Sequence, residues 1–388
     1  MNVTRLGFAH FRNLRDGEIR PCDTINVIYG SNAQGKTNLL EAVWLFTGGH
    51  SFRGAKDGEL PVLENGRNAA LASLEMTVFT EGREQELQLL FKNGRRESVI
   101  NGVEKRTGSA LVGKFCAVIF SPEHLLLVKE GPARRRAFID GALCQMKPAF
   151  ARVLTNYNKA LAQRNALLKD ILRHPELRDT LDIWDQRLIL FGTEVILERI
   201  AFCRALAPKA SEIYGGIAKE KERVSFSYAP FGGADTREEI AAKFFSALKS
   251  AQSTDIRTGF TSAGPHRDDL SIEINGLSAR TYGSQGQQRS IVLALKLAEA
   301  DILFQKTGER PVILLDDVMS ELDMSRRDYL LNHLDGRQVF ITCCDPETVR
   351  LMETGRGFYV EKGTVRQDTD EKAGEVHAEN ETPTCESE

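Results

Sequence analysis

A segment near the N-terminus has the residue types and the spacing that bind phosphate groups. Residues 30–37 read Gly-Ser-Asn-Ala-Gln-Gly-Lys-Thr, which fits the phosphate-loop pattern G-x-x-x-x-G-K-[ST]. Glycines let backbone N–H groups close around phosphate oxygens, and the helix expected to follow adds the positive end of its dipole. We therefore expect Lys36 to reach the β- and γ-phosphates of a nucleoside triphosphate and the Thr37 hydroxyl to be a ligand of Mg²⁺.

Two acidic residues follow an apolar run in the last third of the chain. Residues 312–315 read Val-Ile-Leu-Leu, as in a buried strand, and Asp316 and Asp317 come directly after them. Ligands bind at the carboxyl edge of parallel sheets, so this pair is a natural companion of the phosphate loop. We expect Asp316 to hold Mg²⁺ through water and Asp317 to orient or deprotonate the attacking water. Without the phosphate loop, the pair would equally fit a solvated turn.

A third polar segment opens a helix expected over residues 290–300. Residues 282–289 read Tyr-Gly-Ser-Gln-Gly-Gln-Gln-Arg, and they offer a hydroxyl, backbone amides and a helix N-terminus to an anion. In isolation the segment would be a plain N-capped helix. Its place between the phosphate loop and the acidic strand end, with Ser-Glu-Leu-Asp after them at 320–323, makes it informative.

The elements that must position these segments change character along the chain. The first third has strand patterns, and Asn93-Gly94 and Asn101-Gly102 predict hairpin turns of an antiparallel meander beside the main sheet. From about 131 to 215 apolar residues recur at helical spacing on both sides of Pro175, which indicates long antiparallel helices. Strands are expected at 3–8, 25–29, 70–79, 86–91, 312–315 and 338–342, and helices at 38–45, 290–300 and 329–334.

This pattern predicts an α/β nucleotide-binding head interrupted by helices. Residues 1–130 and 256–366 would build one lobe, and residues 131–255 would build a helical lobe between them. Residues 367–388 hold eight carboxylates against one lysine, and we expect a disordered acidic tail there.

Length and composition limit the classes of protein. The 388 residues are 41% hydrophobic and 27% charged, which suits two or three packed domains. No run of eighteen apolar residues and no signal-peptide layout occur, so we expect a soluble cytoplasmic protein without membrane contact. Seven cysteines without a Cys-x-x-Cys pair disfavour a disulfide framework and a zinc site. The net charge of −3 includes the acidic tail, so the remaining body is mildly basic and permits a nucleic-acid partner.

The ordered segments resemble the ABC-type ATPase family. In that family two subunits clamp two ATP molecules, and each phosphate loop faces the signature segment of the partner. The resemblance implies that Ser284 and Gly286 touch the γ-phosphate bound to the opposite subunit. About 250 residues separate Lys36 from Ser284, a far longer gap than in transporter ATPases. The inserted helical lobe resembles the SMC-like repair ATPases, whose arms are much longer.

Finer motifs resemble the RecF family of bacterial DNA replication and repair proteins over about residues 1–366. The motifs lie at residues 11–14, 30–38, 51–53, 120–123, 264–269, 283–289 and 315–318. The resemblance implies an ATP-dependent homodimer that binds double-stranded DNA near single-strand gaps and hydrolyses ATP slowly. It also implies work with RecR and RecO in loading RecA on SSB-coated DNA, in the SOS response, at the nucleoid.

By this resemblance the catalytic residues would be Asp317, Asp316 and Lys36, with Thr37 and Asp316 as metal ligands. Arg12 lies on the first loop, where SMC-like heads bring a basic residue toward the nucleotide; an ordinary surface arginine is the alternative. The expected nucleotide contacts are Gly30, Ser31, Asn32, Ala33, Gln34, Gly35, Lys36, Thr37, Asn38, Arg12, Ser284, Gly286 and Gln287.

Three departures from the ABC pattern predict slow hydrolysis, with ATP as a timer. Asp317 stands where a glutamate is usual, the signature reads Gly-Ser-Gln-Gly-Gln, and Thr342 stands where many relatives carry a switch histidine. Residues 120–123 occupy about the place of the Q-loop but include no glutamine.

Candidate DNA contacts are Arg53, Lys56 and the triplet Arg134-Arg135-Arg136, because cations grip phosphates. A solvated helix face is an equal alternative for the triplet. Residues 264–269 would form a polar loop that supports the ATP site, or, less favoured, a metal or nuclease cluster around His266. Two other functions stay open: a scaffold that binds ATP and DNA but hardly hydrolyses, and a transporter-type ATPase subunit.

Overall fold

The computed structural model describes residues 1–64, 67–230, 233–344 and 355–368. Its central sheet has the strand order β10-β14-β15-β3-β16-β17. Five of these strands are parallel, and β17 runs antiparallel to β16. The carboxyl ends of the parallel strands therefore meet at one edge. The strands are β10 (Ala117–Phe120), β14 (Val312–Leu315), β15 (Val339–Cys343), β3 (Ile25–Tyr29), β16 (Arg356–Glu361) and β17 (Thr364–Gln367).

A second, antiparallel sheet with the order β2-β1-β6-β7-β8-β9 covers one side of the head. Helix α1 (Lys36–Leu45) joins the two sheets, since its Leu39 and Val43 share a hydrophobic cluster with Leu74 of β6 and Phe340 of β15. The predicted meander and both Asn-Gly turns are confirmed. The strands are β2 (Gly17–Ile19), β1 (Asn2–Ala9), β6 (Leu71–Thr80), β7 (Arg83–Lys92), β8 (Arg95–Ile100) and β9 (Val103–Lys105).

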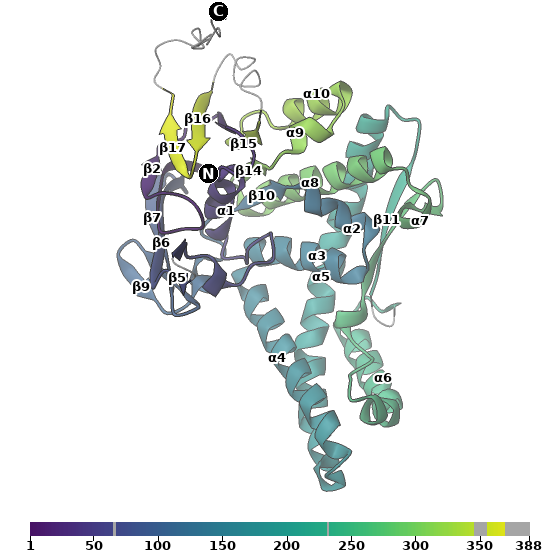
Figure 1. The fold of residues 1–388 in the computed structure, drawn as a ribbon. Coiled ribbons are helices and arrows are strands. Elements are labelled where there is room, and N and C mark those ends of the chain that lie inside the picture. The colour runs from purple at the N-terminus through teal and green to yellow at the C-terminus, as the bar shows by residue number, and fades with distance from the viewer. Residues whose placement is uncertain (65–66, 231–232, 345–354, 369–388) are drawn as a thin grey trace, which may run out of the picture.

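The predicted long helices on both sides of Pro175 are confirmed (Figure 1). Helices α3 (Pro132–Met146) and α4 (Pro148–Ile171) precede it, and α5 (Leu181–Ala218) and α6 (Arg237–Thr258) follow. We call α4, α5 and α6 the arm, because part of this bundle projects away from the two sheets (Figure 1). The predicted lobe boundary at 255/256 falls within the last turn of α6, and the division into lobes stays a prediction.

The remaining elements connect the arm to the head. The expected helix at 290–300 is the central part of a longer helix, α8 (Gln285–Thr307), which Ser284 caps and Gly308 ends at a φ of 75°. The helix expected at 329–334 is likewise longer, as α10 (Met324–His333). The other elements are β4 (Leu63–Glu64), β5 (Arg67–Asn68), α2 (Leu126–Lys129), β11 (Val224–Ala229), β12 (Asp269–Ile274), β13 (Leu277–Ser278), α7 (Ala279–Tyr282) and α9 (Val318–Glu321).

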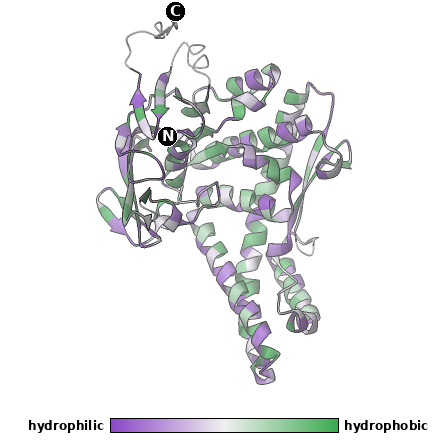
Figure 2. Ribbon diagram, viewed as in Figure 1, coloured by the Kyte–Doolittle hydropathy of each residue, from purple (hydrophilic) through white to green (hydrophobic). Residues whose placement is uncertain are grey.

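The arm shares a hydrophobic core with the head. One cluster of buried residues includes Tyr157 of α4, Leu188 of α5, Leu295 of α8 and Leu315 of β14. The arm helices carry hydrophobic and hydrophilic residues along their length (Figure 2), as amphipathic helices do when one face is buried. The arm is therefore packed onto the head instead of being joined to it only through loops.

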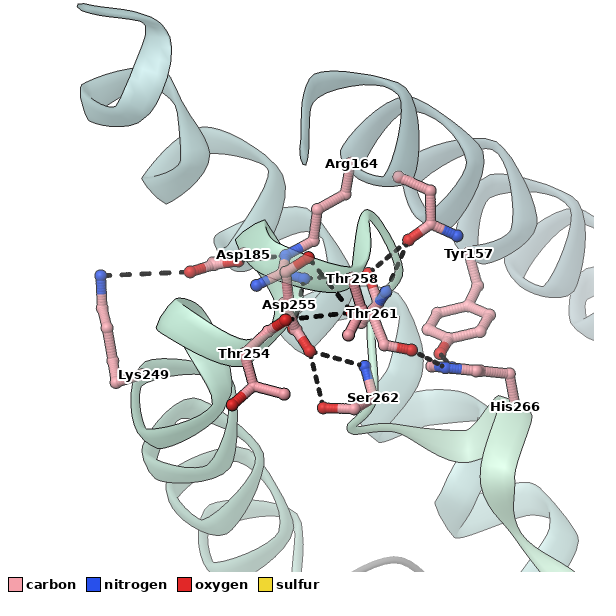
Figure 3. Close-up of polar contacts among 11 residues, drawn as sticks. Tyr157, Arg164, Asp185, Lys249, Thr254, Asp255, Thr258, Thr261, Ser262 and His266 are labelled. Atoms are coloured by element: carbon pink, nitrogen blue, oxygen red, sulfur yellow. Dashed lines mark hydrogen bonds and ion pairs between the residues drawn. The ribbon is translucent and has the colours of Figure 1, made fainter. Parts of the chain in front are cut away.

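A buried charge network also ties the three arm helices together (Figure 3). Arg164 of α4 is fully buried. Its Nε donates to Asp185 Oδ1 of α5 at 2.7 Å, and its Nη1 donates to Asp255 Oδ2 of α6 at 2.8 Å. The same Nη1 lies 2.9 Å from the Thr261 hydroxyl, and Ser262 donates to the other oxygen of Asp255. Removing one partner of a buried ion pair strands the other charge in a poorly solvated place.

We expect Asp255→Ala to lower the free energy of unfolding by about 3–5 kcal/mol, because Arg164 loses a buried counter-ion. Urea denaturation followed by circular dichroism would measure the loss. Asp235→Ala is the matched control, since Asp235 pairs with Arg204 at 2.8 Å with both side chains more than 60% exposed, and it should leave stability nearly unchanged. Equal losses in the two variants would contradict the role given to the network.

Candidate active site

The phosphate loop joins β3 to α1 at the carboxyl edge of the central sheet. Gly30 and Gly35 have φ angles of 143° and 119°, which side chains other than glycine rarely tolerate. A Cβ at Gly30 would also lie 2.3 Å from the Val360 carbonyl oxygen. Because α1 begins at Lys36, its N-terminal amides face the loop. The predicted phosphate-binding geometry is therefore present, with both glycines where the chain needs them.

Lys36 is buried inside this loop, with 5% of its surface exposed. Its ammonium donates to the carbonyl oxygens of Gly30 at 2.7 Å and Ser31 at 3.0 Å. It also lies 3.5 Å from the Cys344 Sγ, after β15. The cation thus has only uncharged partners among the described residues, and phosphate oxygens would be stronger acceptors for it.

Thr37 and Asp316 meet at the same edge although 279 residues separate them. The Thr37 hydroxyl donates to Asp316 Oδ1 at 2.8 Å, and the Thr342 hydroxyl lies 3.0 Å from the same oxygen. Burial raises the pKa of Asp316, and the hydrogen bonds from Thr37 and Thr342 act in the opposite direction. A hydroxyl and a carboxylate are hard oxygen donors that suit Mg²⁺. The predicted metal-ligand pair is therefore brought together.

Asp317 lies next to this pair, at the turn between β14 and α9. It is half-buried and adopts a left-handed backbone conformation with φ 52° and ψ 14°. Its N–H donates to the Thr342 hydroxyl at 2.9 Å, and its carbonyl accepts from the Ser320 hydroxyl at 2.8 Å. A left-handed residue other than glycine is uncommon, and such residues concentrate at functional sites. The catalytic role of Asp317 stays a prediction.

Two further segments support the phosphate loop. Asn13 accepts from Asn38 at 2.6 Å and donates to the Ala33 carbonyl at 3.4 Å. The turn between β16 and β17 donates from Lys362 N to Gln34 Oε1 at 2.6 Å and from Gly363 N to the Gln34 carbonyl at 3.0 Å. Sequence reasoning missed both supports as site residues. The segment at 11–14 was a visible signal for Asn13, whereas nothing local marks residues 362 and 363.

The Arg12 guanidinium group is hydrogen-bonded to other residues of its own chain. Its Nε and Nη2 donate to the two oxygens of buried Glu41 at 2.8 and 3.0 Å, and its Nη1 lies 3.3 Å from the Glu59 carbonyl oxygen. A nucleotide contact by Arg12 would have to be made alongside, or in place of, this bidentate pair. Its role in nucleotide binding stays a prediction.

The signature segment caps α8 far from the phosphate loop of its own chain. Ser284 Oγ accepts from Gln287 N at 3.2 Å, and Gln287 Oε1 accepts from Ser284 N at 2.7 Å, which forms a capping box. Gln287 Nε2 also donates to Glu222 at 2.7 Å. With 23 residues, α8 spans about 34 Å, and its N-terminus at α7 lies well apart from α1 (Figure 1). One copy alone therefore does not bring Ser284 to its own phosphate loop.

The basic residues expected to contact DNA differ in their burial and in their partners. Arg135 is buried and bidentate with Asp269 at 2.7 and 2.9 Å, so neither a DNA contact nor a solvated helix face fits this residue. Arg134 pairs with Glu130 at the surface, and Arg136 donates to the Asp268 carbonyl at 2.7 Å. Arg53 and Lys56 are exposed, and Arg53 donates to Asn38 of α1.

Residues 264–269 lie at the base of the arm. His266 bridges the Tyr157 hydroxyl at 2.6 Å and the Thr261 carbonyl oxygen at 2.9 Å (Figure 3). The Pro265 carbonyl accepts from Arg199 at 2.6 Å. These contacts tie the loop to the arm helices, and its support of the ATP site stays a prediction. Over the described ranges, no group of three or more histidine, cysteine or acidic side chains has the arrangement of a metal site.

The described part of the chain also has no helix that combines the length and the apolar character needed to cross a bilayer. The expected disordered tail at 367–388 begins too early, because Gln367 ends β17 and Asp368 accepts from the Tyr29 hydroxyl at 2.9 Å. The rest of that segment, from residue 369 onward, lies outside the described residues.

Comparisons with known proteins agree with this geometry. Residues 2–367 match the family described as RecF/RecN/SMC N terminal domain. The chain is 40% identical over 364 residues to the DNA replication and repair protein RecF of Acetivibrio thermocellus, which covers 93% of this chain and 98% of that protein. The protein of the same name from Ruminiclostridium cellulolyticum is 39% identical, covering 92% of this chain and 97% of its own length.

Solved structures are similar too. The recombination mediator protein RecF-ATPrS in the RecFOR pathway superposes with a TM-score of 0.88 at 36% identity, covering 94% of this chain and 98% of that chain. An Smc head domain of Pyrococcus furiosus reaches a TM-score of 0.54 at 17% identity, covering 94% of this chain and 95% of its own, a likeness of fold. The predicted α/β fold, an ABC-type P-loop ATPase head, is confirmed.

We expect Lys36→Ala to weaken ATP binding at least tenfold, because hydrogen bonds to charged groups contribute about 1.5–3 kcal/mol each. Equilibrium titration with a fluorescent ATP analogue would measure the dissociation constant. Lys92→Ala, which removes an exposed lysine at the end of β7, should bind the analogue as the wild type does. Unchanged binding by the Lys36 variant would contradict the assignment of the loop.

Proposed function

The chain belongs to the RecF/RecN/SMC family and, within it, to the RecF DNA replication and repair proteins, and from this we propose that it is an ATP-driven DNA clamp. Two copies would bind two ATP molecules face to face and close on double-stranded DNA near single-strand gaps. With RecR and RecO, the clamp would promote loading of RecA on SSB-coated DNA in the SOS response. This DNA substrate would place the protein in the cytoplasm, at the nucleoid.

One observation carries the proposal: each copy holds two halves of a site that it cannot close by itself. The phosphate loop with Thr37 and Asp316 lies at the sheet edge, while Ser284 caps α8 near α7, apart from α1 (Figure 1). The N-terminus of α8 offers a hydroxyl and backbone amides to an anion. A second copy related by a two-fold axis would supply this segment to the first, and the reverse contact would form at the same time.

The proposed mechanism uses residues of both copies. Lys36 and the amides of residues 30–37 hold the β- and γ-phosphates, and Ser284 and Gly286 of the second copy hold the γ-phosphate from the other side. Thr37 and Asp316 would hold Mg²⁺, which neutralises charge on the phosphates. Asp317 orients a water for attack in line with the leaving ADP. Hydrolysis to ADP and phosphate removes the bridge, and the copies separate.

The free energy for closure comes from the higher affinity of ATP for the dimer than for the monomer. Slow hydrolysis follows from Asp317, whose side chain is one methylene shorter than the usual glutamate. The same feature keeps a second function open: a scaffold that binds ATP and DNA with little hydrolysis. Single-turnover phosphate release with and without DNA would separate the two, since a working ATPase should be faster with DNA.

We expect Ser284→Ala to spare ATP binding and to raise the dimer dissociation constant in ATP at least tenfold, through the loss of a hydrogen bond to phosphate of about 1.5–3 kcal/mol. Analytical ultracentrifugation with a non-hydrolysable ATP analogue would measure it. Thr236→Ala is the matched control, since it removes the hydroxyl N-cap of α6, and it should dimerise normally. Normal dimers of the Ser284 variant would refute the shared site.

We further expect sedimentation with gapped duplex DNA to detect a complex in ATP and much less complex in ADP or without nucleotide. The reason is that only the γ-phosphate bridges the two copies. The measurement needs the full chain, one DNA and three nucleotide conditions at the same salt concentration, because phosphate contacts are salt-dependent. Equal binding in all three conditions would contradict an ATP-driven clamp.

A further inference from the structure

A threonine between the two central motifs connects both acidic residues of the site. Thr342 lies on β15, the strand between β14 and β3. Leu315 of β14 pairs with Ile341, so Asp316 and Thr342 are neighbours at the sheet edge. Only 1% of Thr342 is exposed. Its position is thus set by the sheet itself and not by a surface loop.

The hydrogen bonds of Thr342 have one possible direction. The Asp317 backbone N–H can only donate, and it lies 2.9 Å from the Thr342 Oγ1. The single hydroxyl proton is therefore free to go to Asp316 Oδ1, 3.0 Å away. We propose that Thr342 is a positioning residue for ATP hydrolysis, which orients the Asp316 carboxylate and holds the Asp317 backbone in its left-handed turn. The inference rests on the proposed function of this site.

The orientation of the Asp316 carboxylate and the backbone conformation of Asp317 both matter at the carboxyl edge of the central sheet. Asp316 Oδ1 accepts from Thr37 as well, and a hydroxyl that binds a metal through a lone pair keeps its proton, so Thr37 and Thr342 would fix the orientation of the carboxylate together. Partners that hold a metal-binding carboxylate typically contribute 10–100-fold to metal affinity or activity. Asp317 has a φ of 52°, a conformation that non-glycine residues keep only when their surroundings hold it. The Thr342 hydroxyl accepts from the backbone N–H of Asp317, and the Ser320 hydroxyl donates to its backbone carbonyl, so both ends of the turn are held.

The test compares three substitutions in the full chain. Thr342→Val keeps the shape and removes the hydroxyl, and Thr342→Ser keeps the hydroxyl and removes a methyl group. Thr193→Val is the matched control, since Thr193 is buried and its hydroxyl has no hydrogen-bond partner among the described residues. Turnover of MgATP, affinity for ATP without Mg²⁺ and the Mg²⁺ concentration that half-saturates ATP-dependent dimerisation are measured for each.

We expect Thr342→Val to lower kcat by about 10–100-fold and to raise the half-saturating Mg²⁺ concentration, with metal-free ATP affinity within about twofold of the wild type. Thr342→Ser should keep kcat within about threefold, and Thr193→Val should match the wild type. A valine variant with wild-type turnover, or a serine variant as slow as the valine variant, would overturn the proposal.

If the valine variant does not fold, as judged by circular dichroism, Thr342→Ala takes its place, and the proposal then requires the serine variant to be at least tenfold faster than the alanine variant. A wild type that neither dimerises in ATP nor hydrolyses it would overturn the proposed function. A working wild type with an equally active valine variant would overturn this inference alone.

Discussion

The hydrogen bond between Thr37 and Asp316 is the contact on which the rest of the site depends. It joins the start of α1 to the end of β14 across 279 residues of chain, with β15 lying between β14 and β3 in the sheet. The bond can form only when β3, β15 and β14 are in their native register. The proposed metal and nucleotide contacts and Asp317 all lie at this one edge, so the central sheet must fold before this half of the site can form.

The sequence pattern was enough to predict elements whose bounds are determined by residues close to them in the chain. The bounds of β3 and β14 were predicted correctly because each is a short run rich in strand-forming residues between turn residues. The end of α8 was missed: the expected helix stopped at Ala300, although buried Ile302 and Leu303 continue the apolar pattern and the helix ends only at Thr307, before Gly308. Arg135 was misjudged because its partner Asp269 is 134 residues away, and nothing local in an arginine run shows which member is buried. The Lys362–Gly363 support of the phosphate loop escaped prediction for the same reason.

The arm adds a second constraint of a different kind. Arg164, Asp185 and Asp255 bring three buried charges from three helices to one point, and such a set tolerates little change of register because a misplaced partner leaves a charge unpaired. The long helix α5 continues from this network to Tyr214, which donates to Glu222, the acceptor for the signature residue Gln287. The packing of the arm and the orientation of the signature are therefore linked through one rigid element.

If the ATP site is divided between two copies, as proposed, the division has an energetic consequence for slow hydrolysis. In the proposed dimer the N-terminus of α8 would receive its anion only from the second copy, so ATP would gain its full set of contacts only there. Dimerisation would then tighten ATP binding by the same factor by which ATP tightens the dimer. An efficient catalyst would hydrolyse the bridging ATP within milliseconds, and the coupling between ATP binding and dimerisation would be lost. By the proposed mechanism, the shorter carboxylate of Asp317 would prolong the ATP-bridged state instead. Bound ATP would then mark a clamp that stays closed for longer than its association with DNA takes.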